Sequence, residues 1–419
     1  MRRLFYRICR VRKLLGIYIV CFVLFLPFNF PLSHLDIRIP PLSSSLHVEL
    51  AVLIIFFQVY LLKRLISNKD IHFPLAIYFL AIYFLYDVYI SFKGLYTIHS
   101  LKHSLKFFSF SVFILIFQFI ISRDFVSKII KVIGISSVAV SILGIMQFIS
   151  PYLVAPLQRF LNVVYLDPLR IRGPFEWHTT YALYLCVGLP FVLYSFLKAS
   201  KLLSKLLYGL YASLIFLGIL LSNSLGALAT LFLTGLCALF LKIFIRFNIR
   251  FRYFSIFFLC FLVLVPSLFW LKLPLVRKVF YIEDSEKSRI LTWKISLDFI
   301  RERPLWGWGP DTSHLKFLSL RRYRRPPQHS HNIFLETGIN EGLLGLTFFI
   351  FLIILVLRET WKWIHKDLGL GLLFFLGLCT FLIFLQFDVI LYYEDRLLAL
   401  FWTVISLPFF RKDALFTNS

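Results

Sequence analysis

The sequence predicts an all-α, polytopic membrane protein with about twelve transmembrane helices. Hydrophobic residues make up 59% of the 419-residue chain and charged residues only 16%, a balance that soluble globular domains do not have. Apolar windows of roughly 20 residues, long enough to cross a hydrocarbon core of about 30 Å, recur along the chain. Two connections between these windows are much longer than the rest. We therefore expect residues 1–419 to form one integral membrane domain with a long outer loop between spans 9 and 10.

The expected spans follow the apolar windows in order. The first has a basic flank but no small-residue cleavage site after it, so we interpret it as a retained anchor rather than a signal peptide. The spans are predicted at residues 14–31, 46–62, 73–92, 105–122, 130–149, 180–197, 204–221, 225–245, 253–271, 338–357, 368–386 and 396–410.

The distribution of charge predicts the orientation. The net charge is +24, yet the lysines and arginines gather in the connections that follow even-numbered spans and at the N-terminus. This positive-inside pattern predicts that both termini are cytoplasmic, and it argues against a nucleic-acid partner. Five of the six cysteines fall in predicted spans, and their spacing shows neither a disulfide framework nor a zinc motif.

Two long connections, residues 151–179 and 272–338, lie on the outer face in this topology. Both are basic, against the bias that orients the protein. Either these basic residues are carried across the membrane without a functional role, or they bind an anionic ligand. The first loop carries Arg170, Arg172 and His178. Arginine binds phosphate through a two-pronged, permanently charged fork, so these residues are candidate substrate contacts, with lipid headgroup pairing as the alternative.

The second loop contains the stretch "SRILTWKISLDFIRERPLWGWGP", whose apolar residues have helical spacing. We expect a short helix on the membrane surface, ended by Pro304 and the glycines that follow. Arg289 is predicted to lie in its first turn. Unpaired N–H groups at a helix N-terminus attract anions, so an arginine there would complete an anion cradle, although a headgroup-paired arginine fits the spacing equally.

The stretch "QHSHNIFLE" (328–336) precedes the tenth span and holds the main catalytic candidate. His331 titrates near neutrality and could take a proton from an attacking hydroxyl, whereas an interfacial histidine bonded to a headgroup is the alternative. Asn332 could hold a substrate oxygen or orient the ring, and His329 is a further substrate-binding candidate. A metal at His329 and His331 is disfavoured because no third ligand follows at a suitable spacing.

Glu341 is a candidate at the mouth of the tenth span, where an acid is costly enough to indicate a function, with partial hydration as the alternative. It follows His331 by ten residues, roughly 15 Å along a continuous helix. Glu341 could therefore orient His331 only if Gly338 broke that helix. Gly338, Gly342 and Gly345 form a small-residue stripe that favours helix packing.

A series of short motifs runs along the chain. They are R-x-R-G-x-F (170–175), H-x-T-Y-A (178–182), Ser-x-Gly-Ala (224–227), S-R-x-x-x-W (288–293), "RPLWGWGP" (303–310), "HSHNIFLE" (329–336) and "NEGLLG" (340–345). Taken in this order, they resemble the motifs of the O-antigen ligase and polymerase superfamily, over residues 14–410. The His-Asn-aromatic-Leu run followed by Glu-Gly-x-x-Gly is the most specific. Many members have arginine inside the Ser-x-Gly-Ala motif, where this chain has Leu225.

The resemblance implies a metal-independent glycosyltransferase of the bacterial inner membrane. Such enzymes take a glycan from undecaprenyl diphosphate on the periplasmic face and join it to a hydroxyl of lipid A–core. Carried over by position, Arg170 or Arg172 would hold the diphosphate together with Arg289, and His331 would assist the acceptor. The alternatives are an O-antigen polymerase, a protein O-oligosaccharyltransferase, or a transporter of lipid-linked glycans, for which Asp87 is the clearest polar residue inside a span.

Overall fold

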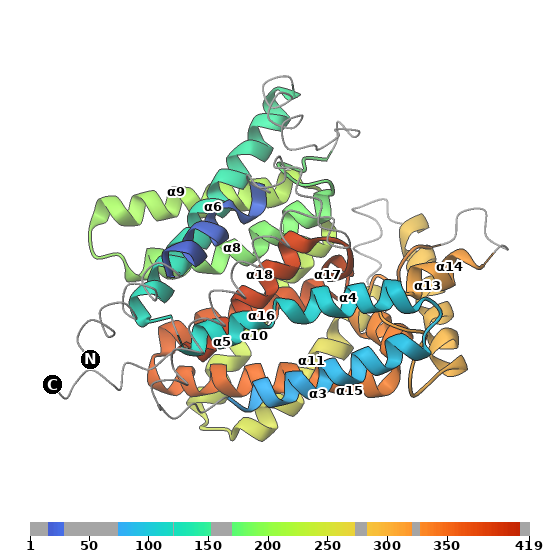
Figure 1. Cartoon of the computed structure of the whole chain (residues 1–419). Coiled ribbons are helices and arrows are strands. Elements are labelled where there is room, and N and C mark those ends of the chain that lie inside the picture. The colour runs from blue at the N-terminus through green and yellow to red at the C-terminus, as the bar shows by residue number, and fades with distance from the viewer. Residues whose placement is uncertain are drawn as a thin grey trace.

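The computed structural model describes residues 16–28, 74–119, 121–151, 170–272, 283–320 and 327–410. Every regular element in these ranges is helical, which confirms the all-α prediction (Figure 1). The predicted span at 46–62 lies outside the described residues. The described helices are α3 (Leu75–Lys93), α4 (Thr97–Ser109), α5 (Val112–Phe119), α6 (Arg123–Ile149), α8 (His178–Lys198), α9 (Leu202–Leu221), α10 (Leu225–Arg246), α11 (Phe251–Lys272), α13 (Glu283–Glu302), α14 (Ser313–Leu318), α15 (Ile333–Lys366), α16 (Leu368–Phe384), α17 (Ile390–Tyr393), α18 (Asp395–Ser406) and the 3-10 turns η1 (Leu26–Phe28) and η3 (Leu407–Phe409).

Several of these helices have the length and composition of membrane spans. In the described part of the chain, seven segments qualify: α3, α4 with α5, α6, α8, α9, α10 and α15. Residues 16–25, 251–262 and 368–384 form shorter apolar helices. The chain is therefore a multi-pass membrane protein, and the count of about twelve spans stays a prediction.

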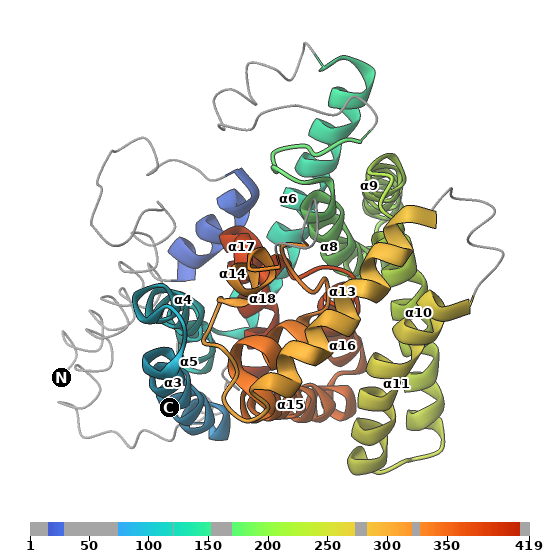
Figure 2. The same cartoon turned by 90° about the vertical axis from the view of Figure 1, so that its right-hand side faces the viewer.

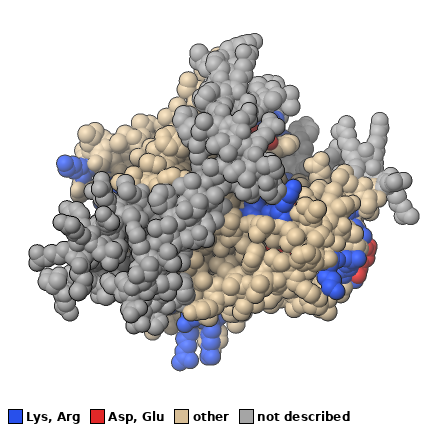
Figure 3. All heavy atoms as spheres, viewed as in Figure 1, with Lys and Arg blue, Asp and Glu red and all other residues tan. Residues whose placement is uncertain are grey.

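The surface of α3 shows how the bundle faces lipid. Leu75, Tyr78, Ile82 and Leu85 on this helix are exposed although all are large and apolar. Figure 3 shows that uncharged residues dominate the surface over α3. A continuous exposed apolar face of this kind is typical of contact with a membrane.

The centre of the bundle includes a helix that is buried on all sides. Every residue of α18 from Arg396 to Ser406 is buried, and Trp402 is among the largest fully enclosed side chains. A helix surrounded in this way belongs to the interior of a bundle. Helix α18 contacts α5, α16 and α17, so this core adjoins the segment at 385–394.

The described part of the second predicted outer loop lies at one end of the bundle, beside the α3–α4 turn and the end of α16. There Leu95 N donates to Trp308 O (3.0 Å), and Ile333 N donates to Leu385 O (2.8 Å), so the α3–α4 turn, the large loop and the end of α16 meet. At the opposite end, Arg123 pairs with Asp367 at 2.7 Å, between the start of α6 and the α15–α16 turn.

Helix α15 begins at Ile333, five residues before the expected boundary, and it is kinked at Gly342. This glycine has φ 69° and ψ −173°, a conformation that residues with a Cβ rarely adopt. The "RPLWGWGP" segment packs against this kink. Gly309 N donates to Asn340 O (2.8 Å), and Leu343 N donates to Pro304 O (2.7 Å). A Cβ on Gly342 would lie 2.3 Å from Leu305 O. The expected packing stripe is thus wrong for Gly342, which serves loop docking instead.

Gly338 behaves as the helix-packing interpretation expects. A Cβ at this position would meet the side chain of Ile300 on α13 at 2.8 Å. Around this contact a small apolar cluster, centred on Phe299, Phe317 and Ile339, joins α13, α14 and α15. Figure 2 shows α13 crossing in front of α15 and α16. The large loop is thereby held on the bundle by its own helices.

Candidate active site

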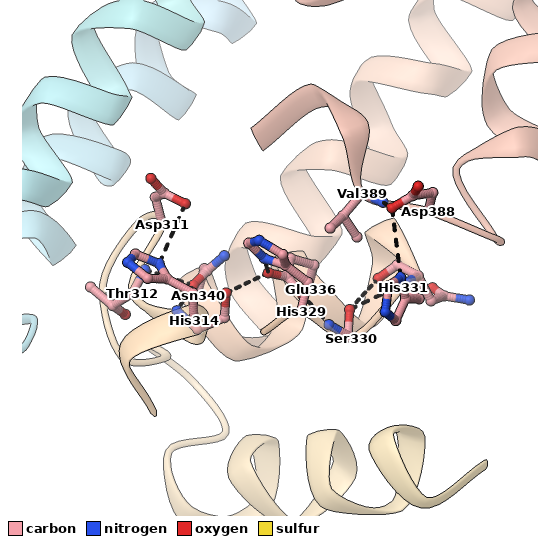
Figure 4. Close-up of polar contacts among 12 residues, drawn as sticks. Asp311, Thr312, His314, His329, Ser330, His331, Glu336, Asn340, Asp388 and Val389 are labelled. Atoms are coloured by element: carbon pink, nitrogen blue, oxygen red, sulfur yellow. Dashed lines mark hydrogen bonds and ion pairs between the residues drawn. The ribbon is translucent and has the colours of Figure 1, made fainter. Parts of the chain in front are cut away.

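His331 faces an acid that lies far from it in the sequence. Its Nδ1 atom is 3.6 Å from Oδ1 of Asp388, which follows α16, and the same oxygen accepts a hydrogen bond from Val389 N at 2.9 Å (Figure 4). His331 immediately precedes the N-cap of α15 and has φ 54°, an uncommon backbone region for a non-glycine residue. Its side chain is 40% exposed, so the ring is both oriented and accessible.

Asp388 is held ionised by its surroundings. Burial opposes the charged form, but the hydrogen bond and charge of His331, the Tyr393 hydroxyl and the Val389 N–H outweigh it and lower the pKa of Asp388. An ionised carboxylate at Nδ1 fixes the tautomer of the imidazole. The other ring nitrogen, Nε2, can then accept a proton from a substrate.

His329 turns to a different acid. Its Nδ1 atom lies 3.1 Å from Oε1 of the buried Glu336, whose other oxygen accepts from Ser330 N at 2.8 Å. Ser313 Oγ on α14 also donates to Glu336. The two histidines of the motif therefore serve different carboxylates, and Glu336 holds the backbone next to His331. This geometry favours a structural role for His329 over the predicted substrate contact.

Asn332 is the N-cap of α15. Its Oδ1 accepts from Phe334 N (3.0 Å) and Leu335 N (3.2 Å), and its Nδ2 donates to Gln386 Oε1 (2.9 Å). A capping asparagine satisfies N–H groups that the first turn leaves without partners. Asn332 thus ties the start of α15 to the end of α16, and the geometry favours this role over the predicted contact with a substrate oxygen.

The arginines of the first loop differ in how firmly they are held. Arg172 is anchored twice, because its main-chain N donates to Gln147 Oε1 (2.9 Å) and its Nη1 donates to Glu176 O (3.1 Å). Arg170 is exposed, and its Nη1 lies 3.4 Å from Nε2 of His178. Arg172 is therefore the better-ordered cation of the two.

The first loop is joined to the segment that carries Asp388. Arg396 Nη1 donates to Pro174 O at 3.0 Å while its Nε pairs with Glu394 at 2.6 Å. The Tyr393 hydroxyl interacts with both Thr179 and Asp388. Sequence spacing could not show that the outer loops meet, and these contacts bring the first loop to the partner of His331.

One expectation about position is wrong, and one conditional role is excluded. Arg289 is the seventh residue of α13, which begins at Glu283, so it does not lie in the first turn and the helix N-terminus cannot form a cradle with it. Helix α15 is not broken at Gly338, and Glu341 lies before the kink at Gly342. The Glu341 carboxylate instead accepts from Tyr83 OH at 2.6 Å, so it does not orient His331.

Asp388, Gln386 and Tyr393 were not singled out from the sequence. A signal was present, because "QFD" (386–388) interrupts an apolar run at the outer end of the eleventh predicted span. An acid at such a position is as costly as Glu341 at the mouth of the tenth span. The pairing with His331 depends on the long-range contact between α15 and α16, which no local pattern encodes.

Comparison with known families agrees with the motifs. Residues 210–350 match the family model described as O-antigen ligase. This range includes Arg289, His331 and Glu341, whereas the first-loop arginines and Asp388 lie outside it. No curated protein sequence gives a significant match to the chain.

Proposed function

Because the chain is a member of the O-antigen ligase and polymerase superfamily, we propose that it transfers a glycan from undecaprenyl diphosphate to a hydroxyl of lipid A–core. The reaction takes place on the periplasmic face of the bacterial inner membrane. The observation that carries this proposal is the pair formed by His331 and Asp388, which lies near the contact between Pro174 at the end of the first loop and Arg396. A buried acid that orients an accessible histidine is the arrangement of a general base.

In the proposed reaction, the acceptor hydroxyl donates a hydrogen bond to Nε2 of His331. The proton passes to the imidazole as the oxygen attacks the anomeric carbon, and the bond from that carbon to the diphosphate breaks. Undecaprenyl diphosphate leaves with the electron pair. Asp388 stabilises the imidazolium that forms. A single displacement of this kind inverts the anomeric configuration.

The leaving diphosphate gains charge as the bond breaks, and fixed cations stabilise that charge. Gln147 anchors the main chain of Arg172, and the carbonyl of Glu176 accepts from its guanidinium, so the charge is oriented before substrate binds. We assign Arg172 to the diphosphate, with Arg289 as the second cation and Arg170 beside His178 at the more exposed edge. Removing one preorganised donor of this kind costs about 10²–10³ in rate. Arginine charge cannot be titrated away, so this reaction needs no metal or other cofactor.

The acceptor separates the ligase from its nearest alternative. A polymerase of the same superfamily would use the same donor and extend a second lipid-linked glycan. The test offers purified protein in detergent an undecaprenyl-diphosphate glycan together with either lipid A–core or a second lipid-linked glycan, with chelator present. Glycan on lipid A–core supports the ligase. Lengthened lipid-linked chains, with lipid A–core unmodified, would contradict the ligase assignment and identify the protein as a polymerase.

A further inference from the structure

A second cluster of histidines surrounds one carboxylate on the same end of the bundle. His99 Nε2 lies 3.0 Å from Oδ2 of Asp311. His314 Nδ1 lies 3.9 Å from Oδ1 of the same carboxylate, and Figure 4 shows Asp311 and His314 side by side. One ligand atom from each of His99, Asp311 and His314 can be chosen so that all lie within 4.8 Å of one another. The buried His103 approaches the same carboxylate, with its Nδ1 3.6 Å from Oδ2.

These residues come from separate elements that are each held firmly. His99 and His103 lie one turn apart on α4, whereas His314 is in α14 and Asp311 precedes it. Asn340 Oδ1 on α15 accepts from Thr312 N (3.0 Å) and Ser313 N (2.8 Å), which fixes the start of α14. The cluster is therefore placed by three helices rather than by one mobile loop.

We propose that His99, Asp311 and His314 bind a zinc ion, or another divalent transition metal that prefers imidazole and carboxylate ligands. Two imidazoles with one carboxylate form a donor set that zinc takes in proteins. Tetrahedral zinc, with bonds of about 2.0–2.2 Å, holds its donor atoms about 3.5 Å apart. The widest separation here must close by about 1 Å, which side-chain rotation supplies. His103 or water completes the coordination.

This metal would be structural rather than a reactant. It would link α4 to α14, and Ser313 of α14 donates to Glu336, which in turn holds Ser330 N beside His331. Binding would therefore stabilise the docked loop without touching the acceptor or the diphosphate. The inference stands independently of the transfer reaction, since it concerns metal affinity and unfolding.

The experiment uses the full chain, purified in detergent without a histidine tag and stripped of metal with a chelator. Zinc is titrated in and counted by mass spectrometry, and cobalt serves as a spectroscopic probe through its visible absorption. The variants are Asp311→Asn and the double substitution His99→Ala with His314→Ala. Asn tolerates the positive φ of 56° at position 311, so the first variant removes the charge and keeps the backbone. His365→Ala, at an exposed histidine on the last turn of α15, is the matched control.

We expect one zinc ion per chain, with the cobalt bands of a tetrahedral site, and a higher unfolding temperature with zinc than without it. Both variants should bind zinc at least about tenfold more weakly, while His365→Ala binds like the unsubstituted chain. Zinc affinity that is equal in all four proteins, or absent from the unsubstituted chain, would overturn the proposal. Loss of metal should leave transfer activity intact at temperatures where the chain stays folded, so this test and that of the transferase are separable.

Discussion

The imidazole of His331 and the carboxylate of Asp388 meet at the outer end of the bundle, with Nδ1 and Oδ1 3.6 Å apart. The acid follows α16 and the histidine precedes α15, and the hydrogen bond from Ile333 N to Leu385 O holds these two ends together. Neither residue is placed by its own helix alone. The function proposed here depends on this long-range contact.

Replacing Asp388 by Asn should lower the transfer rate by about 10²–10⁴, because the amide no longer fixes the tautomer or stabilises the imidazolium. The Michaelis constants for donor and acceptor should change far less than the turnover number. Steady-state kinetics over a range of pH measure both. Asp298→Asn is the control, since Asp298 is an exposed acid whose Oδ1 contacts Arg301 within α13. Equal rates for both variants would remove Asp388 from the mechanism.

Replacing Arg172 by Lys should reduce turnover per bound donor by about 10²-fold, because a point charge cannot reproduce the two-pronged contact with a diphosphate. The measurement is transfer at saturating acceptor and varied donor. Arg301→Lys provides the comparison, because Arg301 is an exposed arginine on α13. If Arg170→Lys were impaired and Arg172→Lys were not, the two arginines would exchange their assigned roles.

Much of the fold could be predicted because apolar windows report membrane spans directly. The expected span at 180–197 agrees with α8 (His178–Lys198), and the expected span at 225–245 agrees with α10 (Leu225–Arg246). The start of α13 was misjudged since its first residues, from Glu283 to Lys287, are mostly charged and carry no apolar period. The apolar period alone predicts a helix that begins near Arg289, whereas α13 begins six residues earlier, at Glu283.

The sequence predicts a site residue only where a single local motif indicates both the residue and its position. The position of His331 before a helix follows from "HSHNIFLE" alone. Its partner does not, because Asp388 reaches it only through the packing of α15 on α16. The kink at Gly342 was also hidden, since its cause is the "RPLWGWGP" segment that docks there from a distant part of the sequence.

Replacing Gly342 by Ala should destabilise the protein by about 1–3 kcal/mol from backbone strain alone, with a further steric cost at Leu305 O. Gly235→Ala on α10 is the matched control, because a Cβ there meets nothing within 4 Å. Thermal unfolding in detergent compares the two variants. An unchanged unfolding temperature for Gly342→Ala would contradict the docking of "RPLWGWGP" at the kink.

The pH dependence of stability should report the pair of His329 and Glu336. Burial disfavours the charged imidazole, but the hydrogen bond and charge of Glu336 outweigh it and raise the pKa of His329 above its ordinary 6.5. A raised pKa means that the folded state binds the proton more tightly, so the stabilisation is fully present below pH 6.5 and is lost as pH rises through the folded value.

Unfolding temperatures of the unsubstituted chain and of His329→Asn, measured from pH 5.5 upward, test this dependence. The difference between the two proteins should be largest at the acidic end and should shrink as the pH increases. A difference that grew with pH would mean that His329 is neutral in the folded protein.

The central claim is that His331 is the base that activates the acceptor, and the most direct measurement is glycan transfer by His331→Ala beside His365→Ala. Both proteins should purify folded, with a cooperative unfolding transition above the assay temperature. We predict that transfer to lipid A–core is abolished in His331→Ala and normal in His365→Ala, whose substitution lies at the far end of α15. Near-normal transfer by a folded His331→Ala protein would contradict the account.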